Sequence, residues 1–318
     1  MRRATISVAI TTRDRPQALT RCLESLRLSR TLPIEVVVSD QSSSCESRDI
    51  AARADRPELP VRWVDGGTNG LAGGQNAAFE HTTTPVVAVL DDDCVADPGW
   101  IEALDREFNG DRLLALVGGR VLAQPASGER AFPVSSRTSA KRRRFTTARA
   151  PWEVGSGNNF ALRREWFDRI GGCDERLGPG TPGKGGLDMD LFYRVLRAGG
   201  RAVYEPGAVV FHEPATRSGR LERRFPYGYG MGAACAMRLR EGDLYAAWLL
   251  AGWLLLRARV LAGALLRRHW RAWHEEALVV SGTAAGIVHG ITQPPPARDS
   301  PGARRFERSR RTRRGARD

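Results

Sequence analysis

Short apolar runs alternate with amphipathic stretches along the first hundred residues of the chain. The runs are rich in valine and isoleucine, as buried strands are, whereas the stretches between them repeat apolar residues at helical spacing. Strands that alternate with helices indicate an α/β fold with a mainly parallel sheet flanked by helices. The predicted strands are residues 6–10, 34–38, 61–64 and 86–90, and the predicted helices are residues 17–28, 49–54, 76–81 and 101–108.

Beyond residue 110 the pattern mixes short apolar runs with glycine-rich and charged segments. Residues 125–150 have no regular period and predict a loop, and the glycine and aromatic residues 225–231 predict a turn before a helix that reaches residue 240. Further predicted strands are residues 113–117, 120–122, 201–204 and 208–211, and residues 187–198 form the predicted helix between them.

Two apolar runs follow, residues 244–256 and 277–291, with a Trp- and Arg-rich segment between them. The first run has thirteen residues without a charge, fewer than the about 18 that a bilayer-spanning helix needs. The pattern fits a membrane interface, and equally a pair of helices packed on the main domain or on a second subunit. We therefore expect an α/β domain at 1–230, a helical extension at 231–293 that is a candidate for membrane association, and a disordered basic tail at 294–318.

Nearly half of the formal net charge of +13 comes from residues 298–318, which hold nine arginines and three acidic residues. Such a tail is most often a solvated end, with anionic lipid as the functional alternative, and we expect no nucleic-acid partner. Five scattered cysteines favour a reducing compartment over a disulfide framework or a zinc site. The first apolar stretch is too short for a signal-peptide core. We expect a cytoplasmic protein, with a peripheral position on the inner face of the cell membrane as an option.

Three carboxylates, Asp91, Asp92 and Asp93, stand where the predicted strand 86–90 ends. Adjacent carboxylates repel and raise one another's pKa, so they require either a compensating cation or full solvation. Mg²⁺ or Mn²⁺ is the candidate ion, because hard divalent cations prefer oxygen ligands. The alternative is a solvated acidic turn before the next helix, with Asp97 as its N-cap. The triplet alone does not decide between these two interpretations.

Polar residues also follow the first two predicted strands. Thr11 comes after the first strand, and Asp40 ends the second. Because ligands of parallel sheets gather beyond the carboxyl ends of the strands, we expect both to share one crevice with the aspartate triplet. The glycines of residues 66–74 lack the spacing of a dinucleotide-binding turn, and no phosphate-binding lysine follows them. A dinucleotide site is therefore not expected.

A second group of candidates lies in the second half of the chain. The predicted helix 187–198 begins with Asp188 and Asp190, and the last predicted strand is followed by His212. Acids in a first turn are ordinary partners of the helix dipole, and residues two apart face different directions. Only one of the two aspartates is therefore expected to face the crevice. A lone histidine after a strand is more often structural than a ligand.

The order of these residues over positions 1–230 resembles that of the family 2 glycosyltransferases of GT-A fold. The resemblance implies a nucleoside-diphosphate sugar donor, a Mg²⁺ or Mn²⁺ cofactor and inversion at the anomeric carbon. Two positions depart from the family's pattern: Leu187 stands where a Glu usually precedes the base, and Gln75 stands where an Arg usually precedes Asn76. The matching residues are Asp40, the triplet 91–93, the loop 172–174, Asp188 and His212.

The resemblance also assigns roles. It implies that Asp188 is the general base, with Asp190 as the alternative because of Leu187, and that Asp93 and His212 bind the metal. Asp40 is assigned to the nucleoside and Asp91 to the ribose. The further residues expected to bind substrate are Thr11, Arg13, Asn76 and Asp92.

The implied function is transfer of a sugar from the donor to a hydroxyl of a carbohydrate or lipid-linked acceptor, in the synthesis of a cell-envelope glycan or glycolipid. The chemistry agrees, because a metal stabilises the charge on the leaving diphosphate and a carboxylate removes the proton of the attacking hydroxyl. Two alternatives stay open: a noncatalytic carbohydrate-binding or membrane-binding adaptor on the same fold, and a sugar nucleotidyltransferase.

Overall fold

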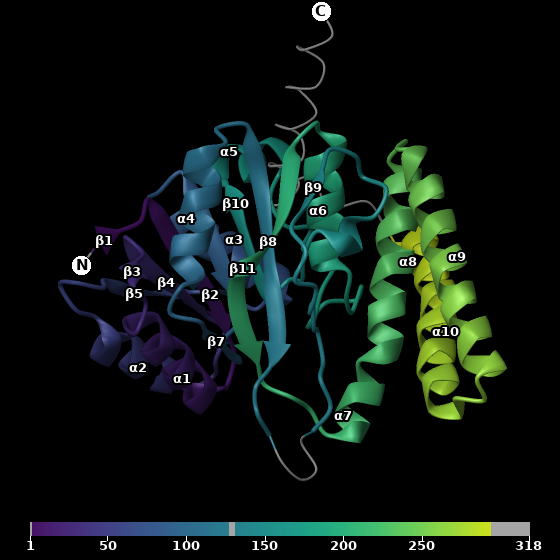
Figure 1. Cartoon of the computed structure of the whole chain (residues 1–318), viewed down its shortest axis with the longest axis horizontal. Coiled ribbons are helices and arrows are strands. Elements are labelled where there is room, and N and C mark those ends of the chain that lie inside the picture. The colour runs from purple at the N-terminus through teal and green to yellow at the C-terminus, as the bar shows by residue number, and fades with distance from the viewer. Residues whose placement is uncertain (1, 127–130, 294–318) are drawn as a thin grey trace, which may run out of the picture.

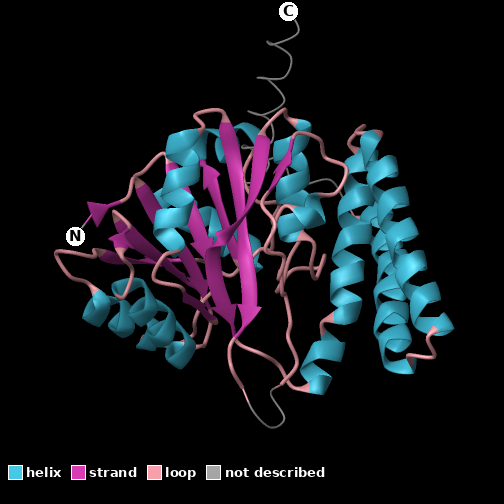
Figure 2. Ribbon diagram, viewed as in Figure 1, coloured by secondary structure: helices cyan, strands magenta, loops and turns pink. Residues whose placement is uncertain are grey.

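The computed structural model describes residues 2–126 and 131–293, so the tail at 294–318 lies outside the described residues. Within the described ranges, a nine-stranded sheet lies between helices, and three long helices stand side by side next to it (Figure 1, Figure 2). The strand order is β5-β4-β2-β6-β10-β8-β11-β7, and β9 pairs with β11. This architecture confirms the predicted α/β fold with a helical C-terminal region.

One half of the sheet is parallel, as the alternation of strands and helices predicts. β2 pairs in parallel with β4 and β6, and β4 pairs in parallel with β5. The carboxyl ends of these four strands therefore meet at one edge of the sheet. The strands are β2 (Ile6–Thr12), β4 (Glu35–Asp40), β5 (Val61–Asp65) and β6 (Val86–Leu90), and the helices between them are α1 (Pro16–Arg27), α2 (Glu46–Ala54) and α3 (Gly70–His81).

The other half of the sheet is mixed. β10 is antiparallel to β6 and β8, and β11 is parallel to β8 but antiparallel to β7 and β9. Strands predicted in two pieces are single strands here, and the break in β11 is a register shift between Glu205 and Val209. The strands are β7 (Cys94–Ala96), β8 (Leu114–Ala123), β9 (Arg143–Phe145), β10 (Asn159–Arg163) and β11 (Arg201–His212); the helices are α4 (Trp100–Gly110), η1 (Pro151–Glu153), α5 (Arg164–Ile170) and α6 (Leu187–Arg197); β1 (Arg2–Arg3) and β3 (Thr31–Leu32) form a separate pair.

Alternate residues of the central strands fill two hydrophobic cores. Successive side chains of a strand point to opposite faces. Val8 and Ile10 of β2 therefore belong to a buried cluster that includes residues of α1, α2 and α4, whereas Ala9 belongs to a cluster with α3, α5 and α6. The helices of each cluster cover one face of the sheet.

The helical extension contributes to the second hydrophobic core, the cluster that contains Ala9 of β2. The long helices are α8 (Arg224–Arg240), α9 (Tyr245–Leu266) and α10 (Trp270–Thr292), and the short α7 (Arg217–Glu222) precedes them. The cluster that includes α3, α5 and α6 also contains Met231 of α8, Trp253 of α9 and Val279 of α10. The boundary predicted at residue 230 lies within α8, and the core continues across it.

The turn predicted over residues 225–231 was wrong, because α8 already begins at Arg224. The glycines of α8 allow it to pack closely against α10. A Cβ at Gly228 would lie 1.9 Å from the carbonyl oxygen of Val279 in α10, and a Cβ at Gly286 of α10 would lie 1.9 Å from the carbonyl oxygen of Tyr229. The two helix backbones are therefore in direct contact, as in helix pairs that pack through small residues.

Helix α9 is the one helix of the described chain that is long and apolar enough to cross a membrane. Its most apolar window has a mean hydropathy of 1.7, and 17% of that window is buried. Several large apolar side chains of α9 face solvent, including Trp248 (77% exposed) and Leu255 (53% exposed). Length and composition do not by themselves distinguish a spanning helix from one that lies on a surface.

Candidate active site

The carboxyl edge of the parallel half brings the predicted site residues together. Thr12 of β2 is in register with Asp40 of β4, and Asp40 is in register with Asp65 of β5. β6 ends at Leu90, so the aspartate triplet begins at the same edge. The parallel strands therefore end together at the edge of the sheet where the crevice was expected.

Asp92 is held by two residues of the first strand and its loop. The hydroxyl of Thr12 donates to Asp92 Oδ2 at 2.7 Å, and Arg15 Nη1 lies 3.2 Å from Asp92 Oδ1. The same Arg15 nitrogen lies 3.2 Å from Asp93 Oδ2. Arg15 therefore bridges two carboxylates. The sequence did not indicate Arg15; it predicted Arg13 as a substrate contact, which stays a prediction, and the exposed Arg13 side chain pairs with the neighbouring Asp14 at 3.8 Å.

The alternation of side chains along β2 explains why Thr12, rather than Thr11, contacts Asp92. Thr11 and Thr12 point to opposite faces of β2. Thr12 faces the triplet, whereas the methyl group of Thr11 lies 2.4 Å from where a Cβ at Gly74 would be. Thr11 therefore packs on helix α3. The alternation of β2 is the signal that would have favoured Thr12 over Thr11 as a polar contact of the triplet.

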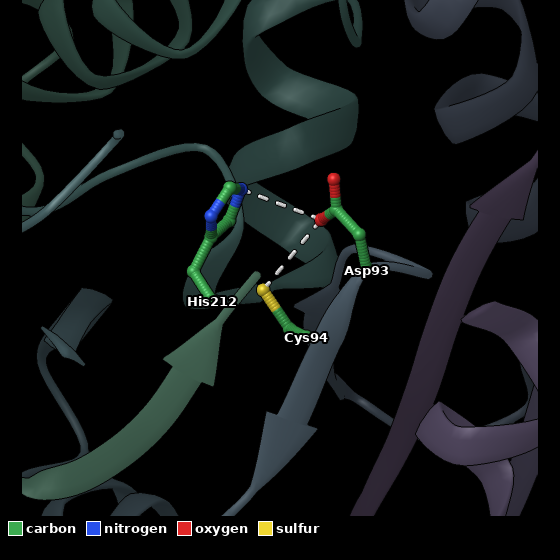
Figure 3. A group of neighbouring side chains, drawn as sticks. All are labelled: Asp93, Cys94 and His212. Carbon is green, nitrogen blue, oxygen red and sulfur yellow. Dashed lines mark hydrogen bonds and ion pairs between the residues drawn. The ribbon is translucent and has the colours of Figure 1, made fainter. Parts of the chain in front are cut away.

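Asp93 also contacts the end of β11. His212 Nε2 lies 3.4 Å from Asp93 Oδ1, and the thiol of Cys94 lies 3.9 Å from the same oxygen (Figure 3). Figure 3 shows the Asp93 carboxylate facing the other two side chains. All three donor atoms lie within 4.8 Å of one another.

Asp93 and His212 fit a hard divalent ion. Neighbouring ligands of an octahedral ion with bonds of about 2.0–2.1 Å lie about 3 Å apart, close to the separation of the two side-chain atoms here. The thiol of Cys94 is a soft donor that Mg²⁺ and Mn²⁺ do not favour. His212 is 4% exposed, and its Nδ1 has no hydrogen-bond partner in the part of the chain that the structure describes. The histidine thus presents Nε2 to Asp93.

Burial and the neighbouring carboxylates raise the pKa of two members of the triplet, Asp91 and Asp92. Burial raises the pKa of Asp91 well above its ordinary value, and the charges of Asp93, Asp92 and Asp188 raise it further. Burial also raises the pKa of Asp92, although Arg15 opposes that shift. A cation at this edge would relieve both effects.

Asp40 is 5% exposed, and each of its carboxylate oxygens has a partner. The indole of Trp63 on β5 donates to Oδ2 at 2.9 Å, and the backbone N–H of Ser42 donates to Oδ1 at 2.9 Å. The guanidinium of Arg48 lies 5.3 Å from the centroid of the Trp63 ring. Trp63 fixes the carboxylate in one orientation, a contact that sequence reasoning missed.

Asp188 lies in the first turn of helix α6 and faces the loop before β10. The backbone N–H of Gly157 donates to its Oδ2 at 2.8 Å, and that of Met189 donates to Oδ1 at 3.0 Å. A Cβ at Gly157 would lie 3.1 Å from the Asp188 side chain, so a residue without one allows this approach. Burial raises the pKa of Asp188, although both backbone hydrogen bonds oppose the shift.

Asp190 points elsewhere. Its side chain is fully buried and lies 2.7 Å from both Arg194 Nε and Arg238 Nε. Arg238 of α8 also pairs with Asp174 and Glu241. Asp190 therefore belongs to an ion network that ties α6 to α8, which agrees with the expectation that only one of the two aspartates faces the site.

The Asn76 side chain forms hydrogen bonds with residues 173 and 175 of the protein itself. Its amide donates to the carbonyl of Cys173 at 3.1 Å and to Glu175 at 2.9 Å, and its oxygen accepts from the Cys173 N–H at 2.8 Å. At 3% exposure it fastens the loop that leads to α6. Asn76 thus positions this loop, and its predicted contact with substrate stays a prediction.

Comparison with known proteins identifies the family. The family model described as "Glycosyl transferase family 2" matches residues 7–171, just over half of the chain. The chain belongs to this family. Its matched region includes the three aspartates at the end of β6 and the acid at the end of β4, whereas Asp188 and His212 lie beyond it.

Curated relatives of this family 2 glycosyltransferase include two from Mycobacterium tuberculosis. The pre-mycofactocin glycosyltransferase is 28% identical over 79% of this chain, and the chain spans about half of that relative, 51% of its length. The N-acetylglucosaminyl-diphospho-decaprenol L-rhamnosyltransferase is 29% identical over 42% of this chain and 43% of its own length.

One solved structure supports the assignment of the fold. The mannosyltransferase PcManGT from Pyrobaculum calidifontis, in complex with GDP-Man and Mn²⁺, superposes with a TM-score of 0.59 at 19% identity. The likeness covers 90% of this chain and 87% of that one. The fold is therefore of the GT-A type.

Proposed function

We propose that this protein is a metal-dependent inverting glycosyltransferase that moves a sugar from a nucleoside-diphosphate sugar to an acceptor hydroxyl. The observation that carries the proposal is the pairing of Asp93 with His212 at the strand edge, next to Asp91, whose carboxylate is within electrostatic range of Asp188 on α6. A metal-ligand pair and a separate buried carboxylate are the two parts that this reaction needs.

The acceptor side of the reaction is assigned to Asp188. Its two backbone hydrogen bonds hold the carboxylate in place, and burial shifts its pKa upward, toward the range of an effective general base. Asp188 would take the proton of the acceptor hydroxyl as that oxygen attacks the anomeric carbon. Direct attack without a covalent enzyme intermediate inverts the configuration of that carbon.

The donor side is assigned to the carboxyl edge. Asp40, oriented by Trp63, would accept hydrogen bonds from the nucleoside, and Asp91 would contact the ribose. Asp93 and His212 would hold a divalent ion, which supplies Lewis-acid stabilisation of the leaving diphosphate. Arg15 neutralises the neighbouring carboxylates and keeps them in position.

The relatives support an acceptor in the cell envelope. One of them is named for transfer to a diphospho-decaprenol glycolipid, and the solved relative was determined with GDP-Man and Mn²⁺. We extend this to the present chain as a proposal: a carbohydrate or lipid-linked acceptor, Mg²⁺ or Mn²⁺ as cofactor, and a cytoplasmic enzyme peripheral to the membrane. The exposed apolar residues of α9 agree with that location.

A donor screen tests the proposal. The full chain is incubated with a panel of nucleoside-diphosphate sugars and Mn²⁺, and release of nucleoside diphosphate is measured beside release of pyrophosphate. We expect one donor to yield nucleoside diphosphate, and Asp188→Asn to bind that donor but to turn it over about 10²–10⁴ times more slowly. Pyrophosphate as the product would favour a nucleotidyltransferase. No turnover of any donor, with binding retained, would favour the adaptor.

A further inference from the structure

Asn158 is the second of the two central residues in a tight turn before β10. The turn is closed by a hydrogen bond from the Asn159 N–H to the Ser156 carbonyl at 3.1 Å. Its first central residue, Gly157, donates its N–H to the Asp188 carboxylate at 2.8 Å. Asn158 therefore lies directly next to the residue that holds the candidate base.

The same turn lies at the edge of the sheet that carries the aspartate triplet. Asn159 pairs in antiparallel register with Leu90, the last residue of β6. One further step along the two chains leads from Asn159 to Asn158 and from Leu90 to Asp91. Asn158 therefore follows the strand pair at the point where the triplet begins, between the positions of Asp91 and Asp188.

The side chain of Asn158 is buried without a hydrogen-bond partner. The residue is 2% exposed, and neither its amide nitrogen nor its amide oxygen makes a hydrogen bond within the described residues. Buried polar groups are almost always paired, because an unpaired one destabilises the fold. The next residue, Asn159, follows this rule: its amide accepts from Trp100 and donates to two backbone carbonyls. Asn158 thus has hydrogen-bonding capacity that the fold itself does not use.

The residues beside this amide are open to solvent. Asp91, Gly157 and Asp188 are each partly exposed, so the crevice is accessible on both sides of Asn158. A molecule that extends from the aspartate triplet to Asp188 must pass Asn158. The unused amide is therefore available to a molecule that occupies the site.

This position fits the sugar of the donor better than its nucleotide. In the proposed reaction the anomeric carbon lies between the diphosphate, at the triplet, and the base Asp188. The transferred sugar therefore lies along the same path as Asn158. A primary amide donates through its nitrogen and accepts through its oxygen. Two adjacent hydroxyl groups of a sugar ring can satisfy both atoms, whereas phosphate oxygens only accept.

We propose that Asn158 binds the transferred sugar through two adjacent ring hydroxyls and thereby contributes to donor specificity. This inference rests on the proposed function, to which it adds a specificity residue and the chemistry that this residue recognises. A site that hydrogen-bonds a substrate hydroxyl discriminates against analogues that lack it. The competing explanation is a structural amide that bonds an enclosed water molecule.

The experiment measures nucleotide binding by titration calorimetry of the full chain with Mn²⁺. The probes are UDP with UDP-glucose, GDP with GDP-mannose, and then the other pairs of the donor panel. The variant Asn158→Leu replaces the amide by an apolar side chain of similar size. We expect it to bind the nucleotide sugar about tenfold or more weakly than wild type, and the free nucleoside diphosphate equally well. Equal losses for both ligands, or no loss for either, would contradict the proposal.

Monodeoxy forms of the bound sugar test the contact itself. In wild type, removal of one hydroxyl of the recognised pair should weaken binding of the nucleotide sugar. In Asn158→Leu the same deoxy sugar should bind as the parent sugar does, because the partner of the missing hydroxyl is already gone. The same loss of affinity in both proteins, for every deoxy position, would mean that Asn158 contacts none of these hydroxyls.

Thermal unfolding separates this role from a structural one. Removal of an unpaired buried amide should not destabilise the protein, so we expect Asn158→Leu to melt at or above the temperature of wild type. Asn159→Leu, which loses three hydrogen bonds, should melt well below it. A comparable fall in both variants would overturn the proposal in favour of the enclosed water. Asn158→Ala repeats the binding test without a large side chain in the turn.

The proposed function is scored separately, by release of nucleoside diphosphate from the donor. If wild type transfers the sugar and Asn158→Leu binds the nucleotide sugar as wild type does, the role of Asn158 is wrong and the function stands. If wild type binds the nucleotide sugar in a manner that depends on Asn158 but releases only pyrophosphate, the sugar contact stands and the transfer reaction is wrong. Binding of no donor by wild type would overturn both.

Discussion

Asp93 places each of its carboxylate oxygens against a different neighbour, Arg15 on one side and His212 on the other. The residue thereby links the end of β6 to the end of β11. In the proposed metal site, Asp93 would supply the negative oxygen that faces His212, because the imidazole supplies only a neutral nitrogen ligand.

We predict that Asp93→Asn lowers the affinity for Mn²⁺ by more than about 100-fold, since loss of an outer partner alone costs about 10–100-fold. Titration of free Mn²⁺ followed by electron paramagnetic resonance measures this affinity. Asp65→Asn, at the same edge on β5, is the control and should bind Mn²⁺ as wild type does. Wild-type affinity in Asp93→Asn would remove Asp93 from the metal site.

The raised pKa of Asp188 gives a pH dependence with a defined sign. A general base acts when it is deprotonated, so kcat/KM should fall as the pH drops through the raised pKa of Asp188, above the ordinary value of 3.8. Because the folded state binds this proton more tightly, the contribution of Asp188 to stability is largest at low pH and is lost as the pH rises.

The measurement is a pH profile of kcat/KM for wild type and for Gly157→Ala. A methyl group at residue 157 would crowd the carboxylate at 3.1 Å and disturb the hydrogen bond that stabilises its charge. We expect the acidic limb to move to higher pH in this variant. A limb that stays in place would mean that another group controls the profile.

Several site residues were predictable, and others were not, for a physical reason. Strand periodicity fixes where strands end, and therefore placed Asp40 and the triplet at one edge. Arg15 and Trp63 reach that edge only through loop geometry and strand pairing, which one sequence does not encode locally. The role assignments themselves remain predictions.

At the scale of elements, α6 and α8 are joined by buried ion pairs. Asp190, Arg194 and Arg238 are each nearly inaccessible to solvent. The Arg176 and Arg238 charges lower the pKa of Asp174 well below its ordinary value, against the effect of burial. Asp174 therefore stabilises the fold at neutral pH, and this contribution is lost as the pH falls toward and below the ordinary pKa of about 4.

We predict that Asp190→Asn lowers the free energy of unfolding by about 3–5 kcal/mol, because it leaves two buried arginines without their shared carboxylate. Chemical denaturation measures the change. Arg21→Gln, which breaks the exposed pair with Glu213, should cost about 1 kcal/mol or less. A small effect of Asp190→Asn on stability together with a dead enzyme would transfer the role of base to Asp190.

The error at the start of α8 has a physical cause. Residues 225–231 resemble a turn because glycine is a poor helix former, yet tertiary packing outweighs that cost of about 1 kcal/mol per glycine. The four-residue spacing of Gly228 and Gly232, repeated by Gly282, Gly286 and Gly290, is the signal that would have predicted two helices in backbone contact.

At the scale of the whole molecule, helix α9 and its junction with α10 expose several large apolar side chains. Trp248 and Leu266 are 77% and 84% exposed on this helix, and Trp270 follows at the start of α10 with 62% exposure. Arginines 267, 268 and 271 surround the junction of the two helices. Exposed tryptophans beside basic residues are typical of a membrane interface.

We predict that the double variant Trp248→Glu and Leu255→Glu abolishes flotation with vesicles that contain phosphatidylglycerol. Each buried large apolar side chain contributes about 1.5–3 kcal/mol, so loss of two should reduce binding about 100-fold or more. Leu113→Glu, a similarly exposed apolar residue (62%) between α4 and β8, is the control. If the double variant still floats, α9 is not the membrane contact.

The direct backbone contact between α8 and α10 also determines how the gene can be shortened for expression. A stop codon after residue 240 would leave Gly228 and Gly232 facing water where the carbonyl groups of α10 had been, and would remove Trp253 from the second core. Such a fragment would retain all residues assigned to the donor and yet be a poor crystallisation target. A fragment that keeps the contact between α8 and α10 ends no earlier than Thr292, the last residue of α10.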